Sequence, residues 1–89
     1  MKTHSLHGIR KKIDRIDRKL MKLVIKRYGV VEKIGRLKNK AGLPVVDKKR
    51  EKDILERINK LNTNDEIKSS IKNIYKCIFN SSYKVERVE

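Results

Sequence analysis

Two basic residues of this sequence stand where the helical spacing of its apolar residues calls for apolar side chains. At about 100° per residue, Arg27 projects within about 20° of Ile16 and Ile34. Lys38 projects within about 20° of Arg27. Each side chain alone could extend its methylene stem and place its charge in water. Two cations at one helical phase, about three turns apart, instead favour a shared role as anion-binding groups in an apolar seam.

Polar residues also interrupt the apolar faces of two later segments with helical spacing. Glu51 falls on the face that carries Leu55, with Arg50 beside it, and a carboxylate buried there needs a partner. Ser82 and Glu86 continue the apolar face of the last segment, where fraying of the helix end is the alternative explanation. These residues would add hydrogen-bonding groups to a cationic site.

Arg10 belongs to the first helical segment but points elsewhere. Because it precedes Arg27 by seventeen residues, it projects about 100° away, and one chain could not easily bring both into one pocket. In an antiparallel pair of chains, the start of one long helix lies near the far half of the other, so Arg10 could complete the partner's site. The alternative is that Arg10 belongs to a solvated Arg-Lys-Lys run.

Together these side chains predict a walled pocket that is rich in cations. The sequence has no cluster with metal-ligand spacing, no nucleophile triad and no glycine-rich phosphate loop. Such a pocket would bind a small dicarboxylate rather than attack it, and we expect no metal and no cofactor. Its predicted members are Arg10 from one chain and, from the other, Arg27, Lys38, Arg50, Glu51, Ser82 and Glu86.

A long helix must carry the first of these residues. Apolar residues recur at three- and four-residue spacing between Ile9 and Leu37, which predicts a helix over about 6–40 that Gly42 caps and Pro44 ends. At 1.5 Å per residue it would be about 52 Å long, whereas a compact chain of this length is roughly 30 Å across. One chain cannot cover such an apolar face, so we expect an intertwined homodimer with antiparallel long helices.

Two shorter helices should follow in an all-α fold. Asp47 is a suitable N-cap for a helix that reaches about residue 61, and after a turn a third helix should span about 65–86. We expect a single domain over residues 1–89, with flexible ends at 1–5 and 87–89. The inner faces should hold Ile54, Leu55, Ile58 and Leu61 in the second helix and Ile67, Ile71, Ile74, Tyr75, Ile78 and Val85 in the third.

The composition narrows the class of partner. The chain has 25 Lys and Arg against 11 Asp and Glu, a formal net charge of +14, so its partners should be anions. Its one cysteine, Cys77, permits no disulfide within the chain, and neither a signal peptide nor a membrane span is visible. We therefore expect a cytoplasmic protein that does not bind membranes.

These residues carry a resemblance to a known family. The segments LHGIRKKIDRIDRKLMKLVIKR and GRLKNKAGLPVVDKKRE resemble the AroQ-class, all-helical chorismate mutases, over roughly residues 6–86. The resemblance implies a dimer of three-helix chains with two equivalent sites. It also implies the [3,3] rearrangement of chorismate to prephenate in phenylalanine and tyrosine biosynthesis, which needs no covalent intermediate, metal or cofactor.

The resemblance implies a role for each cation that faces the substrate. Arg27 and the Arg10 of the partner chain would clamp the two carboxylates in the fork geometry of guanidinium groups. Lys38 would contact a carboxylate and the ether oxygen, where negative charge develops as the bond breaks.

The remaining implied roles concern the ring hydroxyl and its surroundings. Glu51 would accept a hydrogen bond from the ring hydroxyl, with the backbone amide of Asp47 nearby. Arg50 would orient Glu51 and add positive potential. Ser82 would assist a carboxylate, with Ser81 as the alternative because the alignment around residues 62–66 contains a short gap.

Glu86 departs from the commonest family pattern, in which a glutamine donates a hydrogen bond to the ether oxygen. A glutamate must carry a proton to donate in this way, and an ionised carboxylate would repel the developing charge. Either Glu86 is protonated, or the short gap around residues 62–66 misplaces it relative to the family pattern. If it is protonated, the resemblance predicts that Glu86 makes the reaction sensitive to pH.

Two other functions compete with this interpretation. Isochorismate pyruvate-lyases share the fold and the Arg, Arg, Lys pattern, although the intact DKKRE segment favours the mutase. A small basic helical protein that binds nucleic acid would explain the charge. It would leave Glu51 on an inner face unexplained, and aromatic residues are only 4% of the chain, too few for base stacking, so we expect no specific nucleic-acid partner.

Overall fold

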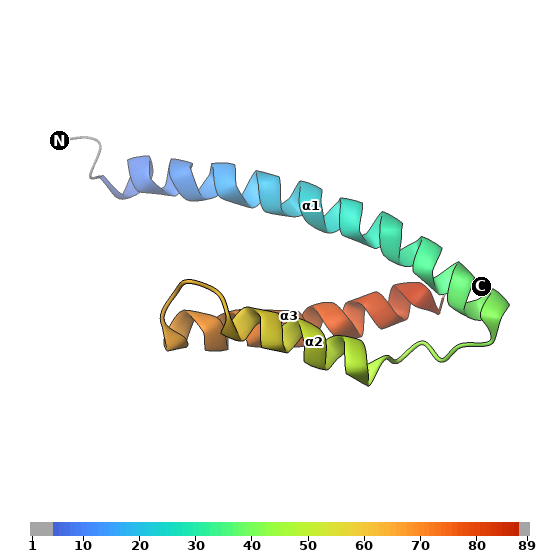
Figure 1. Cartoon of the computed structure of the whole chain (residues 1–89). Coiled ribbons are helices and arrows are strands. Elements are labelled where there is room, and N and C mark those ends of the chain that lie inside the picture. Colours follow the sequence, from blue (N-terminus) through green and yellow to red (C-terminus); the bar gives the residue numbers. More distant parts are fainter. Residues whose placement is uncertain (1–4, 88–89) are drawn as a thin grey trace. The chain divides into compact units, whose positions relative to one another are not determined.

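The computed structural model describes residues 5–87 of the chain, and this part contains three α-helices and no strand. In chain order they are α1 (Leu6–Ala41), α2 (Lys48–Asn59) and α3 (Asp65–Glu86), labelled in Figure 1. The predicted all-α class and the long first helix are confirmed. Apart from Ser5 and Arg87, the ends that we expected to be flexible lie outside the described residues.

Helix α1 ends in the predicted glycine cap. Gly42 has a φ of 67°, a left-handed conformation that glycine adopts without steric cost. Its amide donates to the Asn39 carbonyl at 3.3 Å, and the Leu43 amide donates to the Lys38 carbonyl at 2.9 Å. These two bonds form a Schellman motif, which satisfies carbonyls at the helix end. Pro44 then prevents the helix from continuing.

Helix α2 begins as predicted but ends two residues earlier than predicted. The Asp47 side chain accepts a hydrogen bond from the Arg50 amide at 2.9 Å, so Asp47 is the N-cap. At the other end, the Leu61 amide donates to the Ile58 carbonyl at 3.1 Å, a tighter three-residue turn that closes the helix. Leu61 is 44% exposed, so our placement of it on the inner face was wrong.

Helix α3 has the predicted bounds. The Asn64 side chain caps it by accepting from the Ile67 amide at 2.8 Å. The Lys68 ammonium donates to the Asn59 carbonyl at 2.8 Å, which ties the end of α2 to the start of α3. The connection between these helices is therefore fixed at both ends.

The chain divides into two compact units, Met1–Val30 and Val31–Glu89. The described part of the first unit is a single helical segment, the start of α1. Nine of its large apolar side chains are each about half exposed or more, because a lone helix has nothing within its own unit to bury them against. They are Leu6, Ile9, Ile13, Ile16, Leu20, Met21, Leu23, Ile25 and Val30.

The second unit holds the buried core. Helices α2 and α3 run antiparallel and in contact, and the buried apolar side chains are Val31, Ile58 and Phe79. Phe79 was absent from the predicted inner face. Ile67 and Ile74 are about half exposed, so our placement of these two side chains on the inner face was also wrong.

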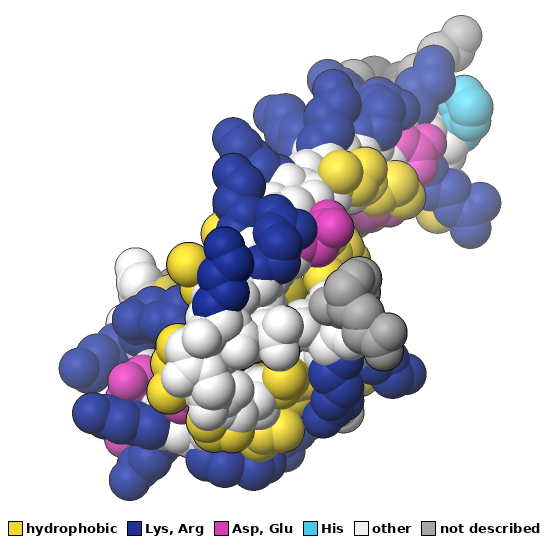
Figure 2. Space-filling model, turned by 90° about the vertical axis from the view of Figure 1, so that its right-hand side faces the viewer, with side chains coloured by type: hydrophobic (Ala, Val, Ile, Leu, Met, Phe, Trp, Pro, Cys, Tyr) yellow, Lys and Arg dark blue, Asp and Glu magenta, His cyan; other side chains and the backbone are white. Residues whose placement is uncertain are grey.

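The surface is strongly basic. Lys and Arg side chains cover much of the face seen in Figure 2, with hydrophobic side chains exposed between them. Among the described residues, no helix is both long enough and apolar enough to cross a membrane.

Gly35 allows the end of α1 to approach the end of α3 very closely. A Cβ atom at this position would lie 2.6 Å from the backbone oxygen of Glu86 and 2.7 Å from its Cα. Both neighbours are backbone atoms, so neither can move aside without shifting a helix. The absence of a side chain at position 35 therefore sets the distance between the two helices, one turn before Lys38.

We expect Gly35→Ala to reduce the free energy of unfolding by about 1–3 kcal/mol, because the new methyl group overlaps the α3 backbone. Gly29→Ala is the matched control in the same helix, since a Cβ there meets nothing within 4 Å. The control should gain up to about 1 kcal/mol of helix propensity. Denaturant unfolding followed by circular dichroism measures both. Equal stabilisation of the two variants would contradict the close approach.

Candidate active site

Lys38 lies at the centre of a polar cluster in the second unit. Its ammonium donates to the Val45 carbonyl at 2.8 Å and to Glu86 Oε1 at 2.6 Å. The side chains of Lys38 and Glu86 are only 17% and 7% exposed. A charge-assisted bond between such shielded groups is stronger than one at the surface. The contact joins the last turn of α1, the following loop and the last turn of α3.

Ser82 and Glu86 occupy consecutive turns of α3 and are both buried. Their predicted place on the inner face is therefore confirmed. Ser81 is only half-buried, which agrees with the choice of Ser82 as the site residue. Their implied contacts with substrate remain predictions.

A second polar cluster joins α2 and α3 through Tyr83. The Tyr83 hydroxyl donates a short hydrogen bond to Glu51 Oε2 and accepts one from the Asp47 amide at 3.3 Å. The other oxygen of Glu51, Oε1, is 3.6 Å from the Lys48 ammonium. Glu51, whose buried carboxylate the sequence predicted to need a partner, is half-buried and contacts both Tyr83 and Lys48.

The Tyr83 phenol keeps its proton at neutral pH. Burial and, after it, the hydrogen bond to Glu51 raise the pKa of Tyr83 above its ordinary value of 10.0. The hydroxyl can therefore act as a donor throughout the physiological pH range. Sequence reasoning missed this residue because it lies beside the apolar stripe of α3 rather than on it.

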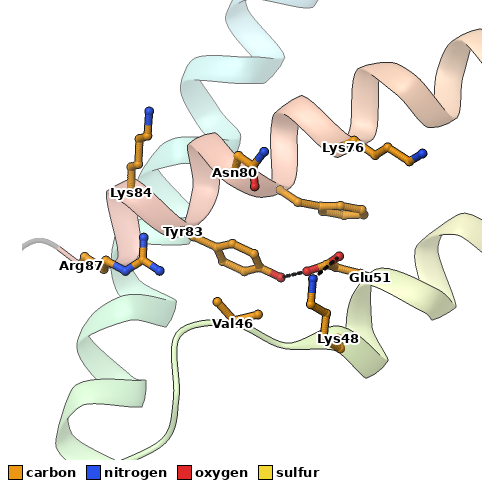
Figure 3. A pocket seen from close by; sticks show the side chains of 9 residues that line it. Val46, Lys48, Glu51, Lys76, Asn80, Tyr83, Lys84 and Arg87 are labelled. Carbon is orange, nitrogen blue, oxygen red and sulfur yellow. Dashed lines mark hydrogen bonds and ion pairs between the residues drawn. The ribbon is translucent and has the colours of Figure 1, made fainter.

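A pocket of about 630 Å³ opens beside this second cluster (Figure 3). Apolar and aromatic groups of Val46, Phe79 and Tyr83 line it together with polar and charged side chains. Glu51 supplies its one carboxylate among the described lining residues, and Figure 3 shows the Tyr83 ring and the Lys48 side chain directed toward that carboxylate. The other lining residues are Lys76, Asn80, Lys84 and Arg87.

The predicted arginines differ in their positions. Arg27, half-buried, and Arg10, exposed, belong to the first unit. Arg50 lies in the first turn of α2 with an exposed side chain. The second unit therefore contains Arg50 and the five other predicted site residues, which are Lys38, Asp47, Glu51, Ser82 and Glu86.

The described residues include no group of three or more His, Cys, Asp or Glu side chains that could hold a metal ion. Cys77 is an exposed free thiol. The two clusters offer ammonium, carboxylate, phenol and backbone amide groups, which can bind anions and hydroxyl groups.

Comparisons with known proteins agree on one family. The family model described as chorismate mutase type II matches residues 9–87. A chorismate mutase of Methanocaldococcus jannaschii is 46% identical over 56 residues, which are 63% of this chain and 57% of that protein. A bifunctional chorismate mutase/prephenate dehydratase of Aquifex aeolicus is 42% identical over 57 residues, which are 64% of this chain and 16% of that protein. The matches thus span little more than half of the first relative and about a sixth of the second.

Solved structures share the fold over almost the whole chain. Form II of the chorismate mutase from Thermus thermophilus superposes with a TM-score of 0.87 at 32% identity, covering 94% of this chain and 96% of that one. A conserved hypothetical protein from Pyrococcus furiosus gives a TM-score of 0.78 at 31% identity, with coverage of 94% and 97%. Their likeness extends through all three helices.

Proposed function

This chain belongs to the type II chorismate mutase family, and we propose that it rearranges chorismate to prephenate for phenylalanine and tyrosine synthesis, as a cytoplasmic homodimer. The observation that carries the proposal is the family match over residues 9–87, a range that includes every residue assigned to the site. The buried contact between Lys38 and Glu86 supports it.

The reaction is an intramolecular pericyclic step, so the protein has no bond to make to its substrate. Its task is to hold the reactive conformer and to stabilise the negative charge that develops on the ether oxygen. Groups that are fixed before the substrate arrives do this best, because they need no reorganisation during the reaction.

Lys38 is held in such a fixed position. An ammonium has three N–H donors, and the contacts to Val45 and Glu86 use two of them. The third is directed by these two and is available to the ether oxygen and the neighbouring carboxylate of the substrate. The low exposure of the ammonium strengthens its attraction for that oxygen.

The carboxylates of chorismate are assigned to Arg27 and to Arg10 of the partner subunit. The half-exposed apolar side chains of the first unit support the dimer, because a second copy of the chain can cover them. Ser82 would assist one carboxylate, and Arg50 would add positive potential at the start of α2. Glu51 and the Asp47 amide would hold the ring hydroxyl.

We expect Glu86→Gln to raise kcat/KM at neutral pH by about tenfold, roughly the worth of one hydrogen bond. Glutamine donates an N–H at every pH, whereas an ionised carboxylate repels the developing charge and offsets the charge of Lys38. Steady-state kinetics at neutral pH measure the effect.

Glu66→Gln is the control for this experiment, because Glu66 is exposed at the other end of α3. It should leave kcat/KM unchanged. If Glu86→Gln also leaves kcat/KM unchanged, Glu86 does not contact the reacting atoms.

A single assay tests the proposed function itself. Purified protein should consume chorismate and form prephenate, followed by ultraviolet absorbance and by chromatography of the product. Isochorismate is supplied in parallel, and release of pyruvate from it, without formation of prephenate from chorismate, would identify a lyase instead.

A further inference from the structure

The contacts of the Tyr83 hydroxyl define a small subsite with a specific chemistry. This single O–H group donates to the Glu51 carboxylate and accepts from the Asp47 amide. The two partners come from the N-cap and the first turn of α2, where the cap geometry fixes the amide. The Glu51 carboxylate and the Asp47 amide together can therefore bind one hydroxyl group. In the free protein this is the hydroxyl of Tyr83.

We propose that Tyr83 fills the subsite for the ring hydroxyl of the substrate in the free protein, and that the substrate displaces it. This inference rests on the proposed function, which assigns the same carboxylate and the same amide to the ring hydroxyl. One carboxylate oxygen and one amide cannot bind both hydroxyls in the same geometry. Tyr83 is thus a residue that sets the affinity for hydroxyl-bearing ligands.

The surroundings of Tyr83 allow its ring to leave. The side chain is half-buried in the last turn of α3, and it lines the pocket of about 630 Å³ beside Val46 and Phe79. Figure 3 shows the ring bordering this pocket, next to Val46, so the space into which it could rotate is open. The other oxygen of Glu51 is 3.6 Å from the exposed Lys48 ammonium, and it is not the oxygen that accepts from Tyr83.

Tyr83 keeps its proton, and so remains able to donate to Glu51, near neutral pH. With its pKa raised above the ordinary value, the phenol stays neutral and remains a donor. A ligand hydroxyl is also neutral and also donates. Both groups therefore remain neutral donors that compete for Glu51 near neutral pH.

The test is Tyr83→Phe, which keeps the ring and removes the competing hydroxyl. Because a ligand no longer has to displace a bound group, KM for chorismate should fall about three- to tenfold, with kcat within about twofold of wild type. Tyr75→Phe is the matched control, since this half-buried tyrosine of the same helix packs against Phe79, with ring centroids 6.0 Å apart. It should change neither constant.

A merely structural role for Tyr83 predicts the opposite result. If its hydroxyl is needed to hold Glu51 in place for the substrate, Tyr83→Phe will raise KM, lower kcat, or do both, and the displacement is then wrong. An unchanged KM for chorismate in Tyr83→Phe would also contradict displacement. Absence of chorismate turnover in the wild-type protein would overturn the proposed function and this inference together, whereas turnover with a raised KM in the variant overturns only the inference.

A binding experiment provides a second readout. Prephenate keeps the ring hydroxyl and is not consumed, so it should bind about three- to tenfold more tightly to Tyr83→Phe than to wild type. The analogue of chorismate without the ring hydroxyl has nothing to offer Glu51 and should bind the two proteins equally. Tighter binding of both ligands, or of neither, would contradict displacement.

Nuclear magnetic resonance can follow the displacement directly. In wild-type protein with 13C at the ζ carbon of tyrosine, the Tyr83 signal is the one missing from Tyr83→Phe. Prephenate should shift this signal, and the analogue without the hydroxyl should not. A Tyr83 signal that saturating prephenate leaves in place would overturn the proposal.

Discussion

Replacing Lys38 with alanine is expected to remove at least about 3 kcal/mol of transition-state stabilisation, so that kcat/KM for chorismate falls by more than about a hundredfold. The reason is the position of the ammonium, which Val45 and Glu86 hold in a shielded site. Steady-state kinetics measure the effect. Lys40→Ala, in an exposed position of the same helical turn, is the control and should keep normal activity.

The loss of activity in Lys38→Ala must be distinguished from a loss of folding. This variant leaves the buried Glu86 carboxylate without its cation, which is itself destabilising. The double variant Lys38→Ala, Glu86→Gln removes that buried charge. It should recover stability in denaturant unfolding but not activity. Near-normal kcat/KM in the single variant would show that Lys38 serves only the structure.

The second large effect concerns sites shared between subunits. Arg10→Ala and Arg27→Ala should each be inactive, yet mixing them and allowing subunits to exchange should restore activity. Each heterodimer then has one intact site, while its other site carries both changes. Random exchange at equal concentrations should give about a quarter of wild-type activity, since half of the dimers are mixed and half of their sites are intact.

A different pair of variants provides the control for subunit exchange. Arg27 and Lys38 are assigned to the same chain's site, so mixing Arg27→Ala with Lys38→Ala leaves one change in each site and should restore nothing. If Arg10→Ala and Arg27→Ala form heterodimers, seen by native mass spectrometry, without recovery, Arg10 does not act across the dimer.

Much of the fold was predictable from local signals. The three- and four-residue spacing of apolar residues located all three helices, and Gly42 and Asp47 were recognised as caps because each has a side-chain property that a helix end requires. The end of α2 was missed because Leu61 continues the apolar spacing although the backbone has already tightened into a turn.

The candidate site was predictable where a polar residue interrupts an apolar face. This rule found Lys38, Glu51, Ser82 and Glu86, and all four are at least half-buried. It could not find Tyr83, whose amphipathic ring suits many positions and whose partner lies thirty-two residues earlier in another helix.

The importance of Gly35 could not be predicted from its own helix either. The sequence shows only that glycine lowers helix propensity there. Glycine is required at position 35 because backbone atoms of Glu86, far away in the chain, lie where a Cβ atom would be. Effects that depend on the distance between two helices become visible only when both are placed.

The connection between α1 and α2 is ordered before any ligand arrives. The Gly42 turn fixes its start, the Lys38 ammonium holds the Val45 carbonyl at its middle, and the Tyr83 hydroxyl holds the Asp47 amide at its end. Fixing a backbone residue costs about 1–2 kcal/mol of conformational entropy, and here that loss occurs during folding. A ligand that binds beside this connection therefore has no loop to freeze, and its contacts there lose little free energy to the ordering of the backbone.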